Sequence, residues 1–569
     1  MTHPAFTFAS SDLVWDHWRR HAETTPDRDA IVHWTAGEEP FRWKWGHLIA
    51  AASQIAAGLR ERGIKQGDVC AIIIRHNRNF YPTYMAVSAL GALPAVLAYP
   101  NARLHPDKFR QGIEGMSLRS GLDCILTERE LDPLIRPLVT KPGSTIREVL
   151  FPLDWFSELD TTARPVDHAQ AKSSDPVLLQ HSSGTTGLQK PVILSHRAVL
   201  EHVKRYGESI ALGPNDKIVS WLPLYHDMGL IAAYYLPLTY GVPVVQLDPF
   251  EWVSAPVLLL EAIARESGTL CWLPNFSYNL MADRIRDDDL AGLRLDTLRM
   301  VINCSEPVRA ESHNKFCTRF ARYGLRWEAL AACYAMAETT YAVTQTAPGR
   351  AARVLPVVRE ELAKGNVVLA SGDEGTRYCV SSGKAISGCQ VRVVDGDRRP
   401  VSQGSVGEIA ITSVSLFDGY RNYPEKTAEV LVDGWYHSGD YGFLHEDECY
   451  VIGRKKDVVI VAGNNVYPED VEDVVGQVEG VIPGRVIAFG AEDEDAGTEL
   501  LCVVAETAAE SAGDRKRVRT AVFKAGMAMD VTIARVYLVP PRWLIKSSSG
   551  KPSRSANKSR ALAELSWKT

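Results

Sequence analysis

Paired cysteines are absent from this sequence. Its ten cysteines are scattered singly over 569 residues, and no two of them are separated by only two other residues. Disulfide frameworks and zinc ribbons both depend on close cysteine spacings, so neither kind of small domain is expected. Scattered single cysteines in a long chain fit a reducing compartment, and we therefore expect a cytoplasmic protein.

Long apolar runs and an excess of positive charge are absent as well. The most apolar window, residues 81–100, is interrupted by Thr83, Ser88, Gly91 and Pro94, so it predicts a buried helix, a turn and a short strand but no membrane span. The N-terminus has no basic segment followed by an apolar one, so we expect no secretory signal. The net charge of −6 gives no overall basic field for nucleic acid.

What remains is the composition of a large globular protein. Apolar residues make up 46% and charged residues 23% of the chain, unlike a disordered protein, and the length suggests roughly three to four compact units. Apolar strand-like runs alternate with helix-period segments, which favours α/β layers with largely parallel sheets. The expected strands are 69–74, 95–99, 124–127, 177–180, 218–221, 242–247 and 300–303, and the expected helices are 45–62, 81–91, 196–212, 254–267 and 311–323.

The pattern changes in the last third of the chain. From about residue 390, closely spaced strands with Gly and Asp turns predict a small β-rich subdomain. A further α/β pattern begins after Arg454, so we expect a boundary and hinge near residues 454–457. The polar, basic tail of residues 547–560 is expected to be mobile, with Arg554 and Lys558 as ordinary solvated side chains.

The strongest chemical signal is residues 178–199, LLQHSSGTTGLQKPVILSHRAV. An apolar strand leads into the small hydroxyl and glycine residues 182–187, and Lys190 follows. Such a segment lets backbone N–H groups curl around an anion, to which the lysine adds a point charge. The glycine spacing does not fit the Walker loop, which argues against a P-loop kinase or ATPase. On composition alone, a flexible surface loop remains the alternative.

This loop resembles the phosphate loop of the adenylate-forming superfamily, which includes acyl- and aryl-CoA synthetases, nonribosomal adenylation domains, luciferases and fatty acyl-AMP ligases. Further motifs match in the order of that family and make coincidence negligible, although they do not name the substrate. They are Tyr334-Ala-Met-Ala-Glu338-Thr, Gly407-Glu408-Ile, Gly419-Tyr420, Trp435-Tyr-His-Ser-Gly-Asp440, Gly453-Arg454-Lys-Lys-Asp457 and Ser548-Ser-Gly-Lys551.

The resemblance implies a fold and a reaction. The fold is α/β: an N-terminal domain, residues 1–453, with two α/β layered subdomains and a small β-barrel-like subdomain, then a small mobile α+β domain, residues 454–569, that turns about Lys456. The reaction joins a carboxylic acid to ATP, with magnesium, and gives an acyl-adenylate and pyrophosphate. Rotation of the C-terminal domain then allows transfer of the acyl group to a thiol.

The resemblance also implies roles for single residues. Lys551 matches the lysine that bridges the acyl carboxylate and the α-phosphate, and Glu338 matches a catalytic, magnesium-binding carboxylate. A carboxylate that attacks a phosphate is one anion approaching another, so the reaction needs positive charge and positioning. The expected ATP-binding residues are Ser182, Ser183, Gly184, Thr185, Thr186, Gly187, Lys190, Tyr334, Glu306, Thr339, Asp440 and Arg454.

Three of these positions carry specific expectations. Asp440 resembles the aspartate that accepts the ribose hydroxyls, Arg454 the arginine that helps to hold the ribose, and Tyr334 the aromatic residue against adenine. An aspartate in a turn, a surface arginine and a core tyrosine are the ordinary structural alternatives.

The nearest match within the superfamily is to the fatty acyl-AMP ligases, through residues 220–231, 273–284 and 303–340. Those enzymes carry an extra segment that restrains the C-terminal domain and hinders CoA use, and residues 340–380 match its place. The match implies a fatty acid substrate and, as acceptor, an acyl carrier protein or a carrier domain of a polyketide or nonribosomal synthetase. An acyl- or aryl-CoA ligase is the alternative.

Four residues are expected to contact the acyl group: His226, Trp221, Tyr235 and Phe276. A general-base role for His226 is disfavoured, because the substrate carboxylate is already ionised near neutral pH, so this residue is expected to gate or shape the acyl channel. The aromatic residues fit either an apolar tunnel or the core equally well.

One departure from the family pattern is Pro191, where relatives usually have glycine after the loop lysine. Proline removes a backbone donor and fixes φ, although the start of an edge strand tolerates it. It is the only motive for a third alternative, a catalytically silent binding module, and the retained Lys551, Asp440 and Arg454 argue against that alternative.

Overall fold

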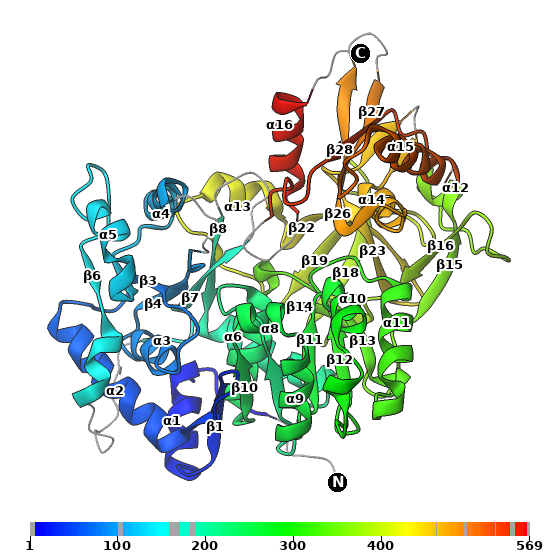
Figure 1. Cartoon of the computed structure of the whole chain (residues 1–569). Coiled ribbons are helices and arrows are strands. Elements are labelled where there is room, and N and C mark those ends of the chain that lie inside the picture. The colour runs from blue at the N-terminus through cyan, green and yellow to red at the C-terminus, as the bar shows by residue number, and fades with distance from the viewer. Residues whose placement is uncertain are drawn as a thin grey trace.

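The structure is a computed structural model that describes residues 6–100, 106–158, 171–182, 189–461, 464–493, 498–529, 531–546 and 552–565. Figure 1 shows N-terminal elements (blue to cyan) beside a body of parallel strands (green), with the C-terminal elements (orange to red) above the β-rich half. The predicted loop residues 183–187 and the predicted catalytic Lys551 lie outside the described residues.

A large mixed sheet links the α/β and β-rich parts of the chain. Its parallel half contains β1 (Asp29–Trp34), β9 (Ile218–Ser220), β10 (Val244–Leu247), β11 (Leu270–Leu273), β12 (Met300–Asn303) and β13 (Leu330–Ala335), with β2 (Phe41–Lys44) antiparallel at the edge. Its antiparallel half contains β14 (Ala342–Gln345), β17 (Lys384–Ala385), β18 (Cys389–Val394), β19 (Gly407–Ser413), β21 (Leu431–Val432), β22 (Trp435–His445) and β23 (Glu448–Arg454). Because β13 pairs parallel with β12 and antiparallel with β14, the β-rich part continues the α/β sheet and begins earlier than residue 390.

Two further sheets lie beside the large one in the N-terminal part. Parallel strands in the order β4 (Leu93–Val96), β3 (Val69–Ile73), β5 (Cys124–Thr127) and β6 (Glu148–Leu150) form a second α/β layer. Antiparallel strands in the order β20 (Gly419–Tyr420), β8 (Lys190–Ser195) and β7 (Pro176–Ser182) join it to the rest. The predicted α/β class is therefore confirmed, whereas the sheets are mixed and not largely parallel, because the β-rich strands extend the large sheet and β7 pairs antiparallel with β8.

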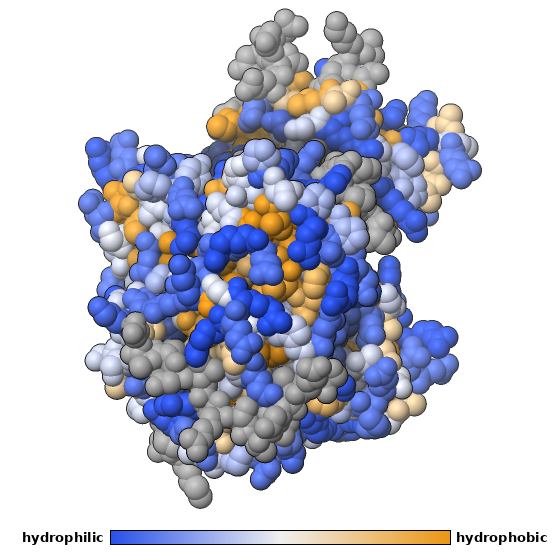
Figure 2. Space-filling view, turned by 90° about the vertical axis from the view of Figure 1, so that its left-hand side faces the viewer, coloured by the Kyte–Doolittle hydropathy of each residue, from blue (hydrophilic) through white to orange (hydrophobic). Residues whose placement is uncertain are grey.

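Helices cover these sheets. They are α1 (Val14–Thr24), α2 (Trp45–Glu61), α3 (Phe80–Ala89), α4 (Pro106–Ser120), α5 (Asp132–Ile135), α6 (His196–Ser209), α7 (Leu236–Tyr240), α8 (Pro249–Ser254), α9 (Val257–Glu266), α10 (Asn275–Arg284), α11 (Ala310–Phe320) and α13 (Pro424–Val430), with the π-helix η4 (Met228–Tyr235) before α7. Figure 2 shows the face that carries α2, α4 and α5, where apolar side chains gather at the centre within a hydrophilic surround.

The local chemistry explains where several helices begin. Ser195 caps α6, and its Oγ accepts the Ala198 N–H at 3.3 Å, as a serine at this position predicts. The predicted helix 254–267 begins later, at Val257, because Ala255 precedes Pro256 and takes a non-helical conformation. Asp248 caps the separate short helix α8 just upstream.

The C-terminal part has its own core. It contains the hairpin β24 (Val459–Val461) and β25 (Asn464–Val466), helix α14 (Pro468–Gly476), and the sheet β26 (Val481–Asp493), β27 (Thr498–Thr507) and β28 (Arg535–Val539), with α15 (Ala512–Met527) and α16 (Arg554–Glu564). Val471, Val475 and Val522 are fully buried in its core. Residues 554–560, expected within a mobile tail, lie in the helix α16 instead.

The segment expected as an insertion folds as a unit. Strands β15 (Val354–Val358) and β16 (Thr376–Val380) pair as an antiparallel hairpin, with helix α12 (Arg359–Ala363) between them. Within the described ranges, no helix is both long enough and apolar enough to cross a membrane.

Several histidines are buried as neutral rings, and His202 shows why. It is 1% exposed, and its Nε2 accepts the Ala342 N–H at 3.2 Å, which requires that this nitrogen carries no proton. Burial lowers the pKa of His202 from 6.5 to about 3. Protonation therefore favours the unfolded chain.

We expect the free energy of unfolding to fall as the pH drops below 6.5 toward 3, because the unfolded chain takes up a proton that folded His202 does not. The neutral burial of His202 alone lowers the free energy of unfolding by on the order of 4 kcal/mol across that range. Urea unfolding at several pH values should give a shallower pH dependence for His202→Gln, whose amide oxygen still accepts the Ala342 N–H. An equal dependence in both proteins would contradict this account.

Candidate active site

The predicted ribose and adenine residues meet at the end of β13. The Tyr334 hydroxyl donates to Asp440 Oδ2 at 2.7 Å, and Arg454 Nε pairs with Asp440 Oδ1 at 2.7 Å. Tyr334 and Asp440 are buried, whereas about half of the Arg454 side chain is exposed. The Asp440 charge raises the pKa of Arg454, and burial raises the pKa of Tyr334. The three predicted residues thus form one charged cluster.

A β-bulge aims Asp440 at this cluster. The register between β19 and β22 shifts between Glu408 and Ala410, and Gly439 has a φ of +72°. Ser438 Oγ accepts the Asp440 N–H and donates to the Ile409 carbonyl, which fixes the bulge. Bulges of this kind re-aim side chains next to active sites, and here the bulge turns the carboxylate toward Tyr334.

A second network holds Glu338 and Lys190. The Tyr420 hydroxyl donates to Glu338 Oε1 at 2.6 Å and accepts from Lys190 Nζ at 3.4 Å. Tyr420 reaches Lys190 because β20 pairs with β8, which begins at Lys190. Burial lowers the pKa of Lys190, while the Glu338 charge opposes this shift. Tyr420 is a site residue without a predicted role, although it lies in the Gly419-Tyr420 motif.

Three cations converge beside these two networks. Lys456 is exposed; partial desolvation lowers its pKa, and repulsion from Arg454 and Lys190 acts in the same direction. Lys190, Arg454 and Lys456 are here called the cationic cluster; Lys190 begins β8, whereas Arg454 ends β23 and Lys456 follows it. Positive charge gathered at one place favours a polyanion such as a triphosphate.

Glu306 and Thr339 lie on the neighbouring loops. Glu306 Oε2 accepts the Phe276 N–H at 2.9 Å, so this carboxylate ties the loop after β12 to the start of α10. Thr339 is buried, and its hydroxyl lies within hydrogen-bond distance of the Met336 and Tyr341 carbonyls. Thr339 follows Glu338 directly, Glu306 lies on the loop after the neighbouring strand β12, and their contact with nucleotide stays a prediction.

The predicted acyl-contact residues divide into two groups. Trp221 stacks on Trp252, with ring centroids 3.8 Å apart, and meets the edge of Phe276. His226 Nδ1 lies 2.7 Å from Asp227 Oδ1. Tyr235, by contrast, lies in the aromatic core, fully buried and hydrogen-bonded to another tyrosine.

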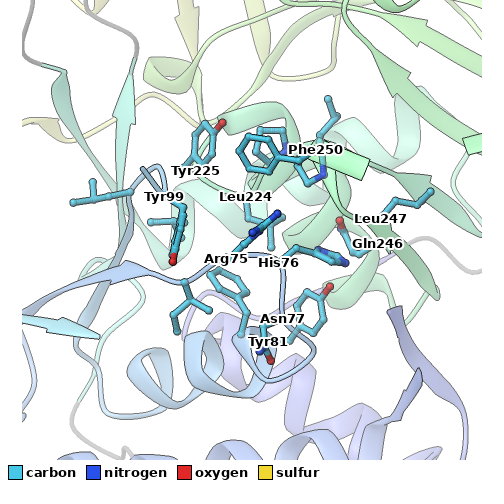
Figure 3. A pocket seen from close by; sticks show the side chains of 17 residues that line it. Arg75, His76, Asn77, Tyr81, Tyr99, Leu224, Tyr225, Gln246, Leu247 and Phe250 are labelled. Atoms are coloured by element: carbon cyan, nitrogen blue, oxygen red, sulfur yellow. The ribbon is translucent and has the colours of Figure 1, made fainter. Parts of the chain in front are cut away.

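An apolar cavity of about 70 Å³ opens next to the first group, although none of the four predicted acyl-contact residues lines it. Figure 3 shows Arg75 and His76 between Tyr81 on one side and Tyr225 and Phe250 on the other. Arg75 and His76 follow β3 after one intervening residue, Ile74. Their position beyond the carboxyl end of a parallel strand is a signal by which sequence reasoning could have found them.

The phosphate loop is described only at its ends. Ser183, Gly184, Thr185, Thr186 and Gly187 lie outside the described residues, and for Ser182 the structure gives only the backbone, at the end of β7.

Pro191 lies in the strand that follows this loop. It is the second residue of β8, the central strand of three, so the edge-strand explanation is wrong. β20 pairs with β8 only from Val192 onward, and the Pro191 carbonyl accepts the Arg421 N–H at 2.9 Å. The start of β8 therefore tolerates a proline, which has no backbone N–H to donate.

Two arginines join the N-terminal part to α14. Asp470 pairs with Arg309 at 3.0 Å and with Arg377 at 2.9 Å. Arg309 follows the Glu306 loop, and Arg377 belongs to the β15–β16 hairpin. All three side chains are largely buried. The expected insertion thus contacts the C-terminal part directly.

Removal of the Asp440 charge tests the ribose assignment. We expect Asp440→Asn to weaken AMP binding about 10- to 100-fold in isothermal titration, because a charged acceptor of hydrogen bonds contributes about 1.5–3 kcal/mol. Asp447→Asn, in the exposed turn between β22 and β23, is the matched control and should bind as the unchanged chain does. Equal affinities for both variants would refute the assignment.

Comparisons with known proteins agree with this geometry. Residues 18–421 match the family model of the AMP-binding enzymes. The chain is 28% identical, over 95% of its length and 96% of the relative, to the probable long-chain-fatty-acid–AMP ligase FadD30 of Mycobacterium tuberculosis. It is 30% identical, over 91% of its length and 90% of the relative, to a putative acyl-CoA synthetase of Caulobacter vibrioides.

A solved structure from a study of fatty acyl-adenylate ligases of E. coli and L. pneumophila superposes with a TM-score of 0.89 at 27% identity. The superposition covers 98% of this chain and 99% of that chain. The resemblance drawn from the motifs is confirmed: the chain belongs to the AMP-binding enzyme family.

Proposed function

We propose that this chain activates a fatty acid by adenylation and then passes the acyl group to a carrier-protein thiol. In the first step a carboxylate oxygen bonds to the α-phosphorus of ATP, and pyrophosphate leaves with the electron pair of the broken P–O bond. In the second step the phosphopantetheine sulfur of an acyl carrier protein, or of a carrier domain in a polyketide or nonribosomal synthetase, attacks the acyl carbonyl and AMP leaves.

The observation that carries this proposal is the cationic cluster beside two fixed carboxylates. Attack of a carboxylate on a phosphate is opposed by like charge, so Lys190, Arg454 and Lys456 supply what the reaction needs most. Asp440 gives the ribose hydroxyls an acceptor beside them. We assign Lys551 the transition-state contact with the carboxylate and the α-phosphate.

Magnesium fits one carboxylate of this site. No group of three or more metal-binding side chains occurs among the described residues, so the protein supplies no complete cage there. Mg²⁺ commonly binds one or two carboxylates together with substrate phosphates, and Glu338 lies beside Lys190, within reach of such phosphates. When bound, the ion would neutralise phosphate charge, with Glu338 as its protein ligand.

The names of the relatives support a fatty acid as the substrate. FadD30 and the superposed ligase are both named for fatty acids. We assign Trp221 and His226 to the acyl path, because residues 222–225, which lie between them in the chain, border the apolar cavity. Phe276 joins them because its ring meets that of Trp221. Tyr235 lies in the core.

The contacts of α14 favour a carrier protein over free CoA. Arg377 of the inserted hairpin holds Asp470 together with Arg309, which restrains the C-terminal part against the N-terminal part. Such a restraint opposes the rotation that would open a CoA path. The Caulobacter relative is named as an acyl-CoA synthetase, so CoA is the acceptor that experiment must compare.

We also assign the enzyme to the cytoplasm. All ten cysteines are free and nine of them are buried, which fits a reducing compartment.

Carboxylate-dependent exchange of pyrophosphate into ATP tests the first half-reaction. Across a panel of acids from C2 to C18 and aryl acids, we expect exchange with fatty acids. Lys551→Ala should lower the exchange rate by about two to three decades while AMP still binds, because its contact forms mainly in the transition state. Near-normal exchange by Lys551→Ala, or no exchange with any acid, would overturn the proposal.

The choice of acceptor is tested by releasing α14. We expect Arg377→Ala to raise the rate with free CoA relative to carrier protein about tenfold, since a lost charged hydrogen bond shifts an equilibrium by about 1.5 kcal/mol. Lys364→Ala, an exposed change in the same hairpin, should leave the ratio unchanged. A chain that uses CoA as readily as carrier protein before any substitution would be a CoA ligase.

A further inference from the structure

The link between the two parts of the chain is four residues long. Lys455, Lys456, Asp457 and Val458 follow β23 and precede the hairpin that starts the C-terminal part. The Lys455 N–H donates to the Gly439 carbonyl at 2.9 Å, and the Asp457 N–H returns to the Arg454 carbonyl at 3.0 Å. The link is therefore a tight turn that begins on the bulge which carries Asp440.

The first link residue is fastened to the N-terminal part. Lys455 Nζ pairs with Glu408 Oε2 at 2.9 Å, and Glu408 Oε1 accepts the Gly439 N–H at 3.1 Å. Glu408 is 7% exposed and stands on β19. One buried carboxylate thus holds both the ribose bulge and the start of the link. We name Glu408, Gly439 and Lys455 the N-side clamp.

Asp457, near the end of the link, is fastened to the C-terminal part. Asp457 Oδ2 pairs with Arg554 Nη1 at 2.6 Å, and Arg554 also pairs with Glu469 and Glu472 of α14, each at 2.9 Å. Its Nε donates to the Ala488 carbonyl on β26. Arg554 is largely buried and is the first residue of α16. We name Asp457, Arg554, Glu469 and Glu472 the C-side clamp.

Lys456 lies between the two clamps and belongs to neither. It has no ion pair with any residue that the structure describes, although both of its neighbours have one. We propose that the N-side and C-side clamps confine the rotation between the two domains to Lys456. Glu408 and Arg554 are the residues that position this hinge. The proposal rests on the proposed function, because only the two half-reactions require the C-terminal domain to rotate.

A swivel confined to one residue has a chemical advantage. Each orientation of the C-terminal part is then set by the two backbone angles of Lys456, and the parts on either side move as rigid bodies. Catalytic groups need placement to within about 1 Å, and larger errors lower rates about 100-fold. Arg554 stands three positions after Lys551 in the sequence, so the same arginine anchors the chain that follows the proposed catalytic lysine to the link.

The distance between the domains tests the clamps directly. Spin labels fit at Leu118→Cys on α4 and Met527→Cys on α15, two exposed positions, in a Cys317→Ser background that leaves only buried cysteines. We expect Lys455→Met and Asp457→Asn each to widen the distance distribution at least 1.5-fold, with and without ATP. The control Lys384→Met removes an exposed ion pair from the same large sheet and should not widen it.

Kinetics separate a positioning role from a general loss of structure. Lys455→Met and Asp457→Asn should lower kcat of both half-reactions about tenfold, with the KM for ATP within twofold. The exchanged pair Glu408→Lys with Lys455→Glu should recover part of the loss relative to Glu408→Lys alone.

Unchanged distance distributions in the Lys455 and Asp457 variants would overturn the clamps, whatever the kinetics. If the unchanged chain supports no acid-dependent exchange, the proposed function fails, but the distance measurement still decides whether the clamps confine the link.

Discussion

The site depends on holding three cationic side chains close together while no nucleotide is bound. Lys190 is partly buried beside the exposed Arg454 and Lys456, and the three cations repel one another, which is unfavourable unless negative charge lies nearby. Asp440 and Glu338 provide that charge, one paired directly with Arg454 and the other acting on Lys190 through Tyr420. The carboxylates thus keep the cations in place before any nucleotide binds to the site that we propose.

The large sheet explains why these groups meet. β13 has a parallel neighbour on one side and an antiparallel neighbour on the other, so its carboxyl end lies where the α/β layer joins the β-rich part. Ligands of open α/β sheets bind at the carboxyl ends of strands. Tyr334 and Glu338 come from that end, Asp440 and Arg454 come from the paired strands β22 and β23, and the sheet brings the two pairs together.

The sequence predicts the strands and the motif residues well, because both are local properties. Apolar runs mark β3, β5 and β12 at their observed places, and the motif residues Tyr334, Asp440 and Arg454 meet as expected. Pairings between distant side chains leave no local trace. Arg554, expected as a solvated tail residue, is largely buried against carboxylates far away in the chain, and Tyr235 lies in the aromatic core. No periodicity distinguishes such a tyrosine from one that lines a tunnel.

Ion pairs form the contact between the N-terminal part and α14, and this has a physical consequence. A buried ion pair adds little net stability, because desolvation offsets its attraction, but it tolerates only a narrow geometry. Asp470 between Arg309 and Arg377 therefore specifies one arrangement of α14 and restrains it there. An apolar interface of equal size would resist separation more strongly, through the area it exposes to water. The rotation that we propose between the two half-reactions is better served by contacts that define a position, oppose departure from it, and can still be given up to water.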